Sequence, residues 1–484
     1  MRYILFLIGL SAFSKELFAN SAIQNLVSKV EARSKQSIEV VRVSDGRTIF
    51  SHNEQVLLTP ASVSKLTIAA AALEMWGPQY TFSTKVYYTG NFSNGVISGD
   101  LIVKGDGDPF LVNEKISVLA SDLKNRGVKE VKGRFILDPS LFDLETRDES
   151  REEGKLSSDN AYDAPISGAG VNFNTFEIAI SPDENGARVL LSPFPLKGFS
   201  IANKVKLGSS TNLQVERFSS KDGRASLVAT GTLAKDAGLI KMYRSVNNPH
   251  LASAEMVRAF IENQGILIRG DIGISETPKA ASEILTLTGY SLDFIVKGLN
   301  NFSNNYIADM LLKRLGSAFP ASGQADQPGS GTESNGLKVL ERYLKSQVGI
   351  KTPFVLKNAS GLSFENRLSA GQINQILLRM AKSLDVFPEF FASLPAAGRD
   401  GTLKKRFQNN EGKSLAANIR AKTGTLTSPR SVSSLAGYVK TPNDGLLAFA
   451  IIGNGLEGKA QPTINELHGF QDKLVSLLAS GGYK

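Results

Sequence analysis

Hydrophobic and polar residues alternate along 37–52 (SIEVVRVSDGRTIFSH), on both sides of an Asp45-Gly46 pair. Alternation with a period of two is typical of a half-buried strand, and Asp-Gly is a preferred hairpin turn. The next stretch, 59–77 (TPASVSKLTIAAAALEMWG), is rich in Ala and Leu and ends at Gly77. This pattern predicts a buried helix. We therefore expect a β-hairpin followed by a helix near the N-terminus.

The C-terminal part of the chain carries the same two patterns. The stretches 415–426 (LAANIRAKTGTL) and 433–455 (SSLAGYVKTPNDGLLAFAIIGNG) predict antiparallel strands, with a turn at 442–445. The stretch 463–480 predicts an amphipathic helix. Strands and helices from the two ends of the chain are therefore expected to form one α+β domain.

Between the two ends lies an internal near-repeat. Each of the stretches 116–138 and 252–274 predicts a helix, a glycine turn and a strand, and the two strands contain Gly133 and Gly270. Two similar helix–strand units can pair in one sheet. The β-rich stretch 164–245 between them is then an insertion within a second domain.

These patterns predict a nested domain organisation. A signal peptide precedes an α+β domain, which is interrupted by an α/β domain II, itself interrupted by a β-rich domain III. The signal peptide is predicted at 1–19, and the α+β domain at 20–79 and 286–484. Domain II is predicted at 80–163 and 246–285, and domain III at 164–245. A Gly-, Ser- and Pro-rich stretch, 316–336, predicts an exposed mobile loop between two helices.

The first 19 residues predict export. Arg2 precedes a short apolar run, and Ala19 is a plausible cleavage point before small residues. The run is too short for a membrane span and is typical of a secretory signal peptide. No later stretch reaches the roughly 18 apolar residues of a membrane span. We therefore expect a soluble periplasmic protein with no transmembrane segment in the mature chain.

Composition excludes several kinds of chemistry. The 484 residues include no Cys, which removes thiol nucleophiles and Cys-ligated zinc, and only 3 His, none paired at metal-ligand spacing. We expect no metal and no organic cofactor. The formal net charge of +9 is spread along the chain without a dense basic block, so we do not expect nucleic acid as a partner. Mild attraction to anionic cell-wall polymers fits an exported protein better.

The first candidate for chemistry is a Ser-x-x-Lys in the predicted buried helix. Ser62 and Lys65 lie three residues apart, so their side chains project from one helix face, and Pro60 can begin the helix. A lysine on a buried helix is a candidate general base, because burial disfavours its charged form. Ser121 and Lys124 share the spacing, but we interpret that lysine as solvated.

The second candidate is the Lys-Thr-Gly within 421–426 (AKTGTL). A strand presents Lys422 and Thr423 to opposite faces, and Gly424 lets a substrate backbone run close alongside. Taken alone, the same triplet is also typical of an edge strand with a protective lysine.

The third candidate is a Ser-x-Asn. We favour Ser303-Asn304-Asn305, because an apolar-periodic helix follows it and can hold a helix–helix turn rigidly. Other triplets also match, namely Ser158-Asp159-Asn160, Ser210-Thr211-Asn212 and Ser245-Val246-Asn247.

In this order, Ser-x-x-Lys, Ser-x-Asn and Lys-Thr-Gly form the signature of penicillin-binding proteins and serine β-lactamases. The chain resembles the class C low-molecular-mass penicillin-binding proteins, the penicillin-binding protein 4 type of D-alanyl-D-alanine carboxypeptidase/endopeptidase. Segments along most of the mature chain carry the resemblance: TPASVSKL (59–66), GDLIVKGDGDP (99–109), LDPSLFD (137–143), VNFN (171–174), NNFSNNYIADMLL (300–312), ASGLSFENRLSA (359–370), LPAAGRDGTLKKRF (394–407) and AKTGTLTSPRSVSSLAGYV (421–439).

The resemblance implies a fold and a mechanism. The fold is an α+β penicillin-binding/serine β-lactamase-like transpeptidase domain with two nested inserted domains. The activity is release of D-Ala from peptidoglycan peptides ending in D-Ala-D-Ala, with D,D-endopeptidase activity on cross-links and acylation by β-lactam antibiotics. The implied catalytic residues are Ser62, Lys65, Ser303 and Asn305, and the implied substrate-binding residues are Lys422, Thr423, Gly424 and Thr425.

The chain departs from the family pattern at two places. Asn358 and Phe364 stand where family members often have Asp and Arg, so the cleft wall is expected to differ. The Trp that often precedes a Tyr-x-Ala-Pro segment is missing from SSDNAYDAPIS (157–167). A substrate-contacting Asp of the family maps onto Asp159, or less well onto Asp163.

Two other functions are compatible with this signature. A β-lactamase needs a placed base for fast deacylation, and no Glu-x-x-Leu-Asn stretch of the class A kind is present. A non-catalytic wall-binding or sensor protein could keep the fold, but a decayed site is expected to have lost at least one of these polar residues.

Overall fold

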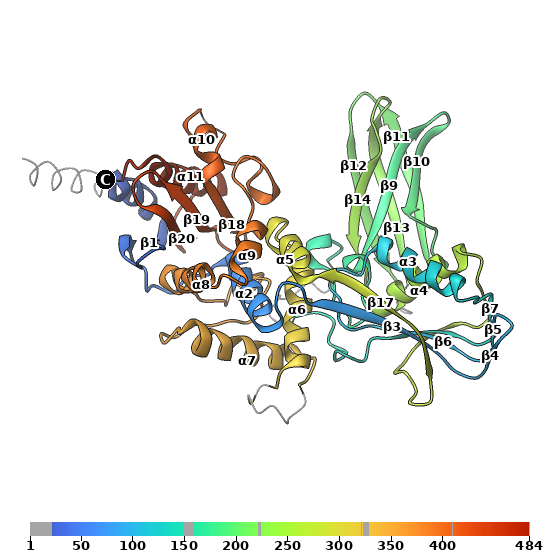
Figure 1. Cartoon of the computed structure of the whole chain (residues 1–484). Helices are drawn as coiled ribbons and strands as arrows, with labels where there is room; N and C mark the ends of the chain where they lie inside the picture. The colour runs from blue at the N-terminus through green and yellow to red at the C-terminus, as the bar shows by residue number, and fades with distance from the viewer. Residues whose placement is uncertain are drawn as a thin grey trace, which may run out of the picture. The chain divides into compact units, whose positions relative to one another are not determined.

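The computed structural model describes residues 22–148, 158–220, 224–320, 322, 329–408 and 410–483. Its contacts divide the chain into two compact units (Figure 1). Unit 1 comprises Met1–Gln79, Leu292–Ala308 and Leu337–Lys484, and unit 2 comprises Tyr80–Ser291 and Asp309–Gly336. The predicted signal peptide lies outside the described residues.

Unit 1 is built around an antiparallel sheet of five strands in the order β18-β19-β20-β1-β2. The predicted hairpin is confirmed, because β1 and β2 pair antiparallel, and so are the C-terminal strands. β1 also pairs with β20, so the two ends of the chain share one sheet. The strands are β1 (Ser34–Arg42), β2 (Thr48–His52), β18 (Ile419–Leu426), β19 (Val432–Thr441) and β20 (Gly445–Gly455).

Helices surround this sheet. The predicted C-terminal helix α11 packs along β19, while α8 packs along β20 and β1. Strands β19 and β20 are buried at nearly every position, which explains why their sequences read as almost continuous apolar runs. Besides a helix at 22–31, the helices of unit 1 are η1 (Ala61–Ser64), α2 (Lys65–Trp76), α5 (Leu292–Asn301), π-helical η5 (Leu344–Val348), α8 (Ala370–Lys382), α9 (Phe387–Ser393), η6 (Gly401–Leu403), α10 (Asn410–Leu415), η7 (Ala416–Asn418) and α11 (Ile464–Ser480).

The predicted helix over 59–77 is a 3₁₀ turn, η1, that continues into α2. Every residue of α2 from Lys65 to Leu73 is buried. Its Ala-rich sequence lets other helices pack closely on all sides, among them α5, α8 and α9. The predicted end is confirmed, because Gly77 closes the helix with a positive φ of 81°.

Unit 2 contains the near-repeat, whose two units pair as expected, and the pairing is parallel. β15 pairs with β7 and β16 pairs with β8. Each predicted strand is split in two at its glycine, so that its halves belong to a four-stranded sheet, β15-β7-β5-β4, and a five-stranded sheet, β16-β8-β6-β3-β17. The elements are β3 (Thr81–Tyr88), β4 (Phe92–Ser93), β5 (Val96–Ile97), β6 (Leu101–Lys104), α3 (Asn113–Asn125), β7 (Glu130–Val131), β8 (Phe135–Asp138), α4 (Pro249–Asn263), β15 (Leu267–Ile268), β16 (Ile272–Ile274) and β17 (Ser282–Ser291).

The two repeat glycines allow neighbouring backbones to touch at this crossing. A Cβ added at Gly270 would lie 2.5 Å from the carbonyl oxygen of Gly133, and one added at Gly133 would lie 2.5 Å from that of Gly99. Any larger residue would push the strands apart where they pass from one sheet to the other. The repeat glycines therefore have a packing role.

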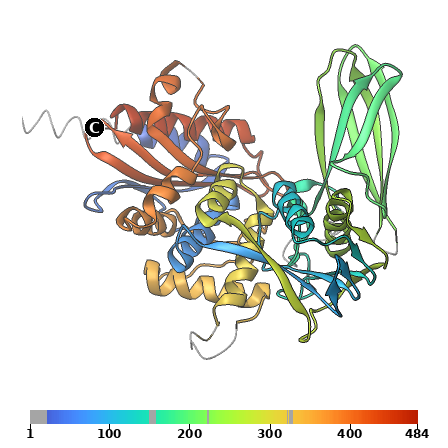
Figure 2. The ribbon, with the colours of Figure 1, turned by 45° about the vertical axis from the view of Figure 1, so that its right-hand side comes forward.

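The β-rich stretch forms two three-stranded sheets, whose long strands run side by side (Figure 2). Their strands are β9 (Thr175–Asp183), β10 (Gly186–Ser192), β11 (Phe199–Gly208), β12 (Asn212–Ser219), β13 (Ala225–Ala234) and β14 (Ile240–Ser245), preceded by the short turns η3 (Ala161–Asp163) and η4 (Asn172–Asn174). Segments 286–291 and 309–336 group with unit 2, whereas the sequence pattern predicted that they belong to the α+β domain. The boundary between domains II and III stays a prediction.

Two helices flank the Gly-, Ser- and Pro-rich stretch. The helix predicted after Ser303 is α6 (Asn305–Ala318), and α7 (Glu333–Tyr343) follows the stretch. Residues 321 and 323–328, at the centre of the predicted loop, lie outside the described residues.

Candidate active site

Ser62 and Lys65 lie together where η1 passes into α2. Ser62 is half-buried, and the side chain of Lys65 is fully buried at the first position of α2. Lys65 Nζ lies 2.9 Å from Ser62 Oγ. The three-residue spacing therefore brings an amine within hydrogen-bond distance of the hydroxyl, which is the arrangement that a nucleophile and its base require.

Two distant segments complete the surroundings of Lys65. Its Nζ donates to Asn305 Oδ1 at 2.7 Å and to the carbonyl oxygen of Ser360. Ser62 Oγ also donates to that carbonyl, at 3.4 Å. Ser360 was not predicted as a site residue, although it lies in the ASGLS stretch that carried the resemblance.

Ser303 lies in the short turn between α5 and α6, as predicted. Its φ of 56° places it in the left-handed region. Asn304 Oδ1 accepts a hydrogen bond from Ile307 N at 3.1 Å, which caps the first turn of α6 and holds the Ser-x-Asn in place. Lys422 Nζ then reaches Ser303 Oγ at 2.7 Å, so the turn joins the Lys-Thr-Gly strand.

Lys422 is fully buried and donates a second hydrogen bond to Thr423 O at 2.7 Å. Burial, and then the charge of Lys65, lower the pKa of Lys422 well below its ordinary value of 10.5. Two buried amines thus face one group of hydroxyl and carbonyl oxygens. Because two positive charges so close together repel, the site favours states in which at most one of the two amines is positively charged.

Gly424 lets β18 lie against the segment that carries Ser62. A Cβ at this position would lie 2.7 Å from Pro60 O and 3.0 Å from Ser62 N, so a side chain here would displace the strand. Thr423 and the exposed Thr425 lie on one face of β18, with Lys422 on the other. The predicted placement of Lys422 and Thr423 on opposite faces is therefore what the strand shows.

Asp159 and Asp163 belong to unit 2. Asp159 Oδ2 accepts a hydrogen bond from Arg217 N at 3.2 Å and forms an ion pair with Arg244 Nε at 3.5 Å. Asp163 is buried and forms an ion pair with Arg147 at 3.6 Å. Substrate contact by Asp159 stays a prediction.

The competing motifs are also in unit 2. The Ser-x-Asn triplets at 158–160, 210–212 and 245–247 belong there, and so does the second Ser-x-x-Lys on α3, whose Lys124 is exposed as predicted. In unit 1, hydrogen bonds join the Ser-x-x-Lys to Asn305 and the Lys-Thr-Gly to Ser303, whereas in unit 2 Ser245 Oγ donates to Ser158 O, which joins two of the competing triplets to each other.

The loop 358–364, where the sequence departs from the family pattern, lies beside Lys65. Asn358 Oδ1 accepts hydrogen bonds from Gly361 N and Asn366 Nδ2, both at 3.0 Å, and so ties the ends of this loop together. Gly361 has a positive φ of 79°, and an added Cβ would collide with the backbone of Ala61. The neutral Asn358 therefore shapes the loop whose Ser360 carbonyl meets Lys65.

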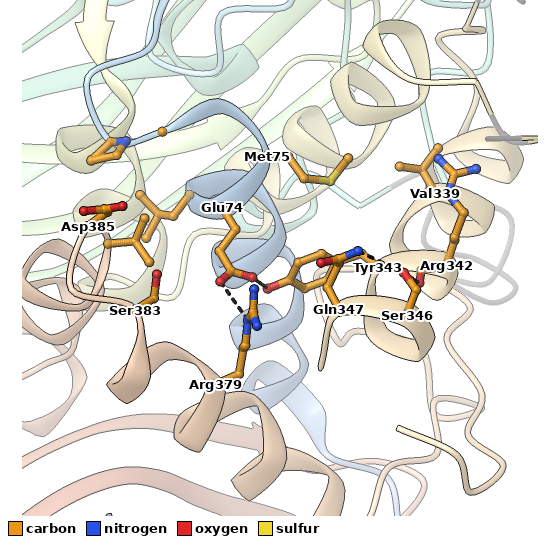
Figure 3. A pocket seen from close by; sticks show the side chains of 14 residues that line it. Glu74, Met75, Val339, Arg342, Tyr343, Ser346, Gln347, Arg379, Ser383 and Asp385 are labelled. Atoms are coloured by element: carbon orange, nitrogen blue, oxygen red, sulfur yellow. Dashed lines mark hydrogen bonds and ion pairs between the residues drawn. The ribbon is translucent and has the colours of Figure 1, made fainter. Parts of the chain in front are cut away.

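A separate cavity of about 460 Å³ lies at the other end of α2 (Figure 3). Glu74, in the last turn of the helix, accepts hydrogen bonds from the Tyr343 hydroxyl at 2.6 Å and from Arg379 Nε at 2.9 Å. Burial and the Glu74 carboxylate raise the pKa of Tyr343, which keeps its hydroxyl protonated. This cavity contains none of the predicted site residues.

Within the described ranges, no group of three or more His, Asp or Glu side chains is arranged to hold a metal ion. Among the helices of the described part of the chain, none combines the length and the apolar character of a membrane span.

Comparisons with known proteins match most of the chain. The model of the D-Ala-D-Ala carboxypeptidase 3 (S13) family matches residues 19–474. A D-alanyl-D-alanine carboxypeptidase of an Actinomadura species is 30% identical over 446 residues, 89% of this chain and 79% of that protein. The D-alanyl-D-alanine carboxypeptidase DacB of Haemophilus influenzae is 25% identical over 458 residues, 93% of this chain and 91% of that protein.

A solved structure matches the fold. The crystal structure of penicillin binding protein 4 from Haemophilus influenzae superposes with a TM-score of 0.75 at 22% identity, covering 95% of this chain and 99% of that one. The fold predicted from the resemblance is therefore confirmed. With a family match over most of its length, the chain belongs to the D-Ala-D-Ala carboxypeptidase 3 (S13) family.

Proposed function

We propose that the chain is a serine-type D-Ala-D-Ala carboxypeptidase that also cleaves D,D cross-links of peptidoglycan through an acyl-enzyme. The observation that carries this proposal is two sets of contacts that meet at the turn containing Ser303 and Asn305. Ser62 meets Lys65 at 2.9 Å, Lys65 meets Asn305 at 2.7 Å, and Lys422 meets Ser303 at 2.7 Å. These contacts support a site in which Ser62 is the nucleophile, Lys65 the base and Lys422 the cation for a carboxylate.

Acylation begins with proton transfer from Ser62 to a neutral Lys65. Ser62 Oγ attacks the carbonyl carbon of the D-Ala-D-Ala bond, and the backbone N–H groups of Ser62 and Thr425 stabilise the resulting oxyanion. The C–N bond then breaks, and the leaving D-Ala nitrogen receives a proton through Ser303. Asn305 orients the Lys65 amine and the substrate amide. Water hydrolyses the ester and restores Ser62.

The terminal carboxylate of the substrate binds Lys422 and Thr423. Burial and the charge of Lys65 lower the pKa of Lys422, and a carboxylate close to it favours its charged form again. Substrate binding thus supplies the negative charge that lets Lys422 stay protonated while Lys65 is neutral. This coupling links recognition of the free carboxylate to activation of Ser62.

The same chemistry explains the proposed partners and location. A β-lactam presents a strained amide beside a carboxylate, so it acylates Ser62 in place of the peptide. The substrate lies in the cell wall, which fits export by the predicted signal peptide to the periplasm. The side chains proposed for these steps need no metal or organic cofactor.

The proposal is tested by acylation and product release. The purified mature protein is incubated with benzylpenicillin, and intact mass followed by peptide mapping locates the adduct. We expect one penicilloyl group on the peptide that contains Ser62, and D-Ala release from diacetyl-L-Lys-D-Ala-D-Ala. Ser62→Ala should remove both while keeping the same thermal melting curve.

Other outcomes identify the alternatives. Consumption of penicillin without a lasting adduct indicates a β-lactamase, because the acyl-enzyme then hydrolyses quickly. Intact penicillin with no adduct indicates a non-catalytic wall-binding or sensor protein. D-Ala release that persists in Ser62→Ala contradicts the assignment of the nucleophile.

A further inference from the structure

The segment 394–402 (LPAAGRDGT) runs along the free edge of β18, beside the Lys-Thr-Gly. Ala421 N donates to Pro395 O at 3.0 Å, and Ala397 N donates to Ile419 O at 3.1 Å. The segment is therefore hydrogen-bonded to the strand that carries Lys422 and Thr423. The proposed mechanism assigns no role to it.

Asp400 ties this segment to the Ser303 turn. A single carboxylate oxygen, Oδ1, accepts hydrogen bonds from Ala396 N at 2.7 Å and from Asn301 Nδ2 at 3.1 Å. Asn301 is the last residue of α5, two positions before Ser303. Gly401 follows with a φ of 51°, and an added Cβ would collide with Asn301 O. The 394–402 segment therefore contacts Asn301 closely through both the Asp400 side chain and the Gly401 backbone.

Thr402 meets the Lys-Thr-Gly directly. Thr402 is exposed, and its Oγ1 lies 2.7 Å from Thr423 Oγ1. A threonine hydroxyl has one proton to donate and can accept hydrogen bonds at the same time. When Thr423 donates its proton to a substrate carboxylate, Thr402 can donate to Thr423 Oγ1. Thr402 is thus placed to orient the hydroxyl of Thr423.

We propose that Asp400 and Thr402 are positioning residues for the substrate carboxylate. Asp400 holds the Ser303 turn against β18, and Thr402 aims the Thr423 hydroxyl at the carboxylate. Two groups proposed to act on substrate, Ser303 and Thr423, lie far apart in the chain, and the 394–402 segment contacts Thr423 and Asn301, the residue two positions before Ser303. This inference rests on the proposed function and adds residues to its carboxylate site.

The first test changes the Thr402 hydroxyl. Thr402→Val keeps the shape but removes the hydrogen bond, and Thr402→Ser keeps the hydroxyl. We expect Thr402→Val to raise KM for diacetyl-L-Lys-D-Ala-D-Ala about three- to tenfold and to slow benzylpenicillin acylation similarly, the effect of one lost hydrogen bond. kcat should change less, and Thr402→Ser should stay near wild type. Thr48→Val, an exposed threonine of β2, is the matched control.

The second test exploits the single accepting oxygen of Asp400. Asparagine keeps an Oδ1 that can accept both hydrogen bonds, whereas alanine keeps none. We expect Asp400→Ala to slow penicillin acylation by about tenfold or more, the loss that follows from two unmade hydrogen bonds, and Asp400→Asn to restore most of the rate. Circular dichroism at the assay temperature confirms that each variant is folded. If Asp400→Ala does not fold, Asn301→Ala, which removes the donor to Asp400 Oδ1, is assayed in its place and should slow acylation.

Specific results overturn the inference. Unchanged KM and acylation in Thr402→Val remove the role of Thr402, and equal losses in Thr402→Ser and Thr402→Val contradict an effect that depends on the hydroxyl alone. Equal losses of acylation in Asp400→Asn and Asp400→Ala contradict the positioning role of Asp400. The wild-type protein is assayed first, so an inactive wild type refutes the proposed function, whereas an active wild type with unaffected variants refutes this inference alone.

Discussion

The two ends of helix α2 handle buried charge in opposite ways. At the C-terminal end, the Glu74 carboxylate is matched by the Arg379 guanidinium and the Tyr343 hydroxyl (Figure 3). At the N-terminal end, Lys65 donates to the neutral oxygens of Ser62, Asn305 and Ser360, and its charge lowers the pKa of a second buried lysine, Lys422.

The difference separates a structural site from a reactive one. A matched ion pair with an added hydrogen bond holds α2 against α7 and α8. Two buried cations destabilise one another, so a proton is held weakly and can move. One helix thus carries a stabilising contact at one end and a site poised for proton transfer at the other.

Lys65→Met should produce the largest effect. Losing the proton acceptor of Ser62 is expected to lower kcat/KM for D-Ala release by about 10²- to 10⁴-fold. Methionine is neutral and fills similar space, so Tm should equal or exceed that of the wild type, because a buried charge has been removed. D-Ala release and a thermal melt measure both. Near-wild-type turnover, or a large fall in Tm, would contradict the assignment of the N-terminal end of α2 as the reactive end.

Glu74→Ala should show the opposite pattern. It leaves the buried Tyr343 hydroxyl without its acceptor, which is expected to reduce the free energy of unfolding by about 1–3 kcal/mol. Urea unfolding measures the loss, and penicillin acylation below the unfolding transition should stay near wild type. A variant that is stable but acylates slowly would show that the C-terminal end of α2 also serves the reaction.

The pH dependence of stability tests the state of Lys422. Its pKa in the folded protein lies below 10.5, its value when unfolded, so the unfolded state binds more protons between the two values. Stability should therefore rise with pH in that window, by up to about 1.4 kcal/mol per pH unit from this group. Lys422→Met should lose this rise, measured by urea unfolding at several pH values. An identical slope in both proteins contradicts the lowered pKa.

Glu74→Gln should have the smallest effect and sharpens the comparison. Glutamine can still accept from Tyr343 and loses only the charge that faces the half-exposed Arg379, so we expect a loss of at most about 1 kcal/mol. Urea unfolding beside Glu74→Ala gives the difference. A loss as large as that of Glu74→Ala would assign the stabilisation to the ion pair and not to the Tyr343 hydrogen bond.

Local pattern was enough for many elements of the fold. Alternation around Asp45-Gly46 predicted the β1–β2 hairpin, and the Ala-rich run predicted the buried α2. The near-repeat predicted two helix–strand units that pair, although it did not show that Gly133 and Gly270 split each strand between two sheets. That split depends on the close approach of neighbouring backbones, which a single strand's sequence does not record.

The active-site residues also differ in how far local sequence could predict them. Ser62 and Lys65 could be paired from sequence because three residues on a helix lie on one face, a distance set by helix geometry. Ser303 could be favoured only by its following helix, since other triplets match equally well. Ser360 and Thr402 were missed as site residues, because a carbonyl and an exposed hydroxyl carry no motif of their own.

By itself, the sequence determined the local elements, the Ser62–Lys65 pair and a resemblance that named the chemistry. Only the tertiary structure decided which oxygens surround the Lys65 amine and which hydroxyl meets Thr423. The physical reason is range. Helical and strand periodicities act over a few residues, whereas the contacts from Lys65 to Asn305 and Ser360 span 240 and 295 residues and exist only once sheet and helices have packed.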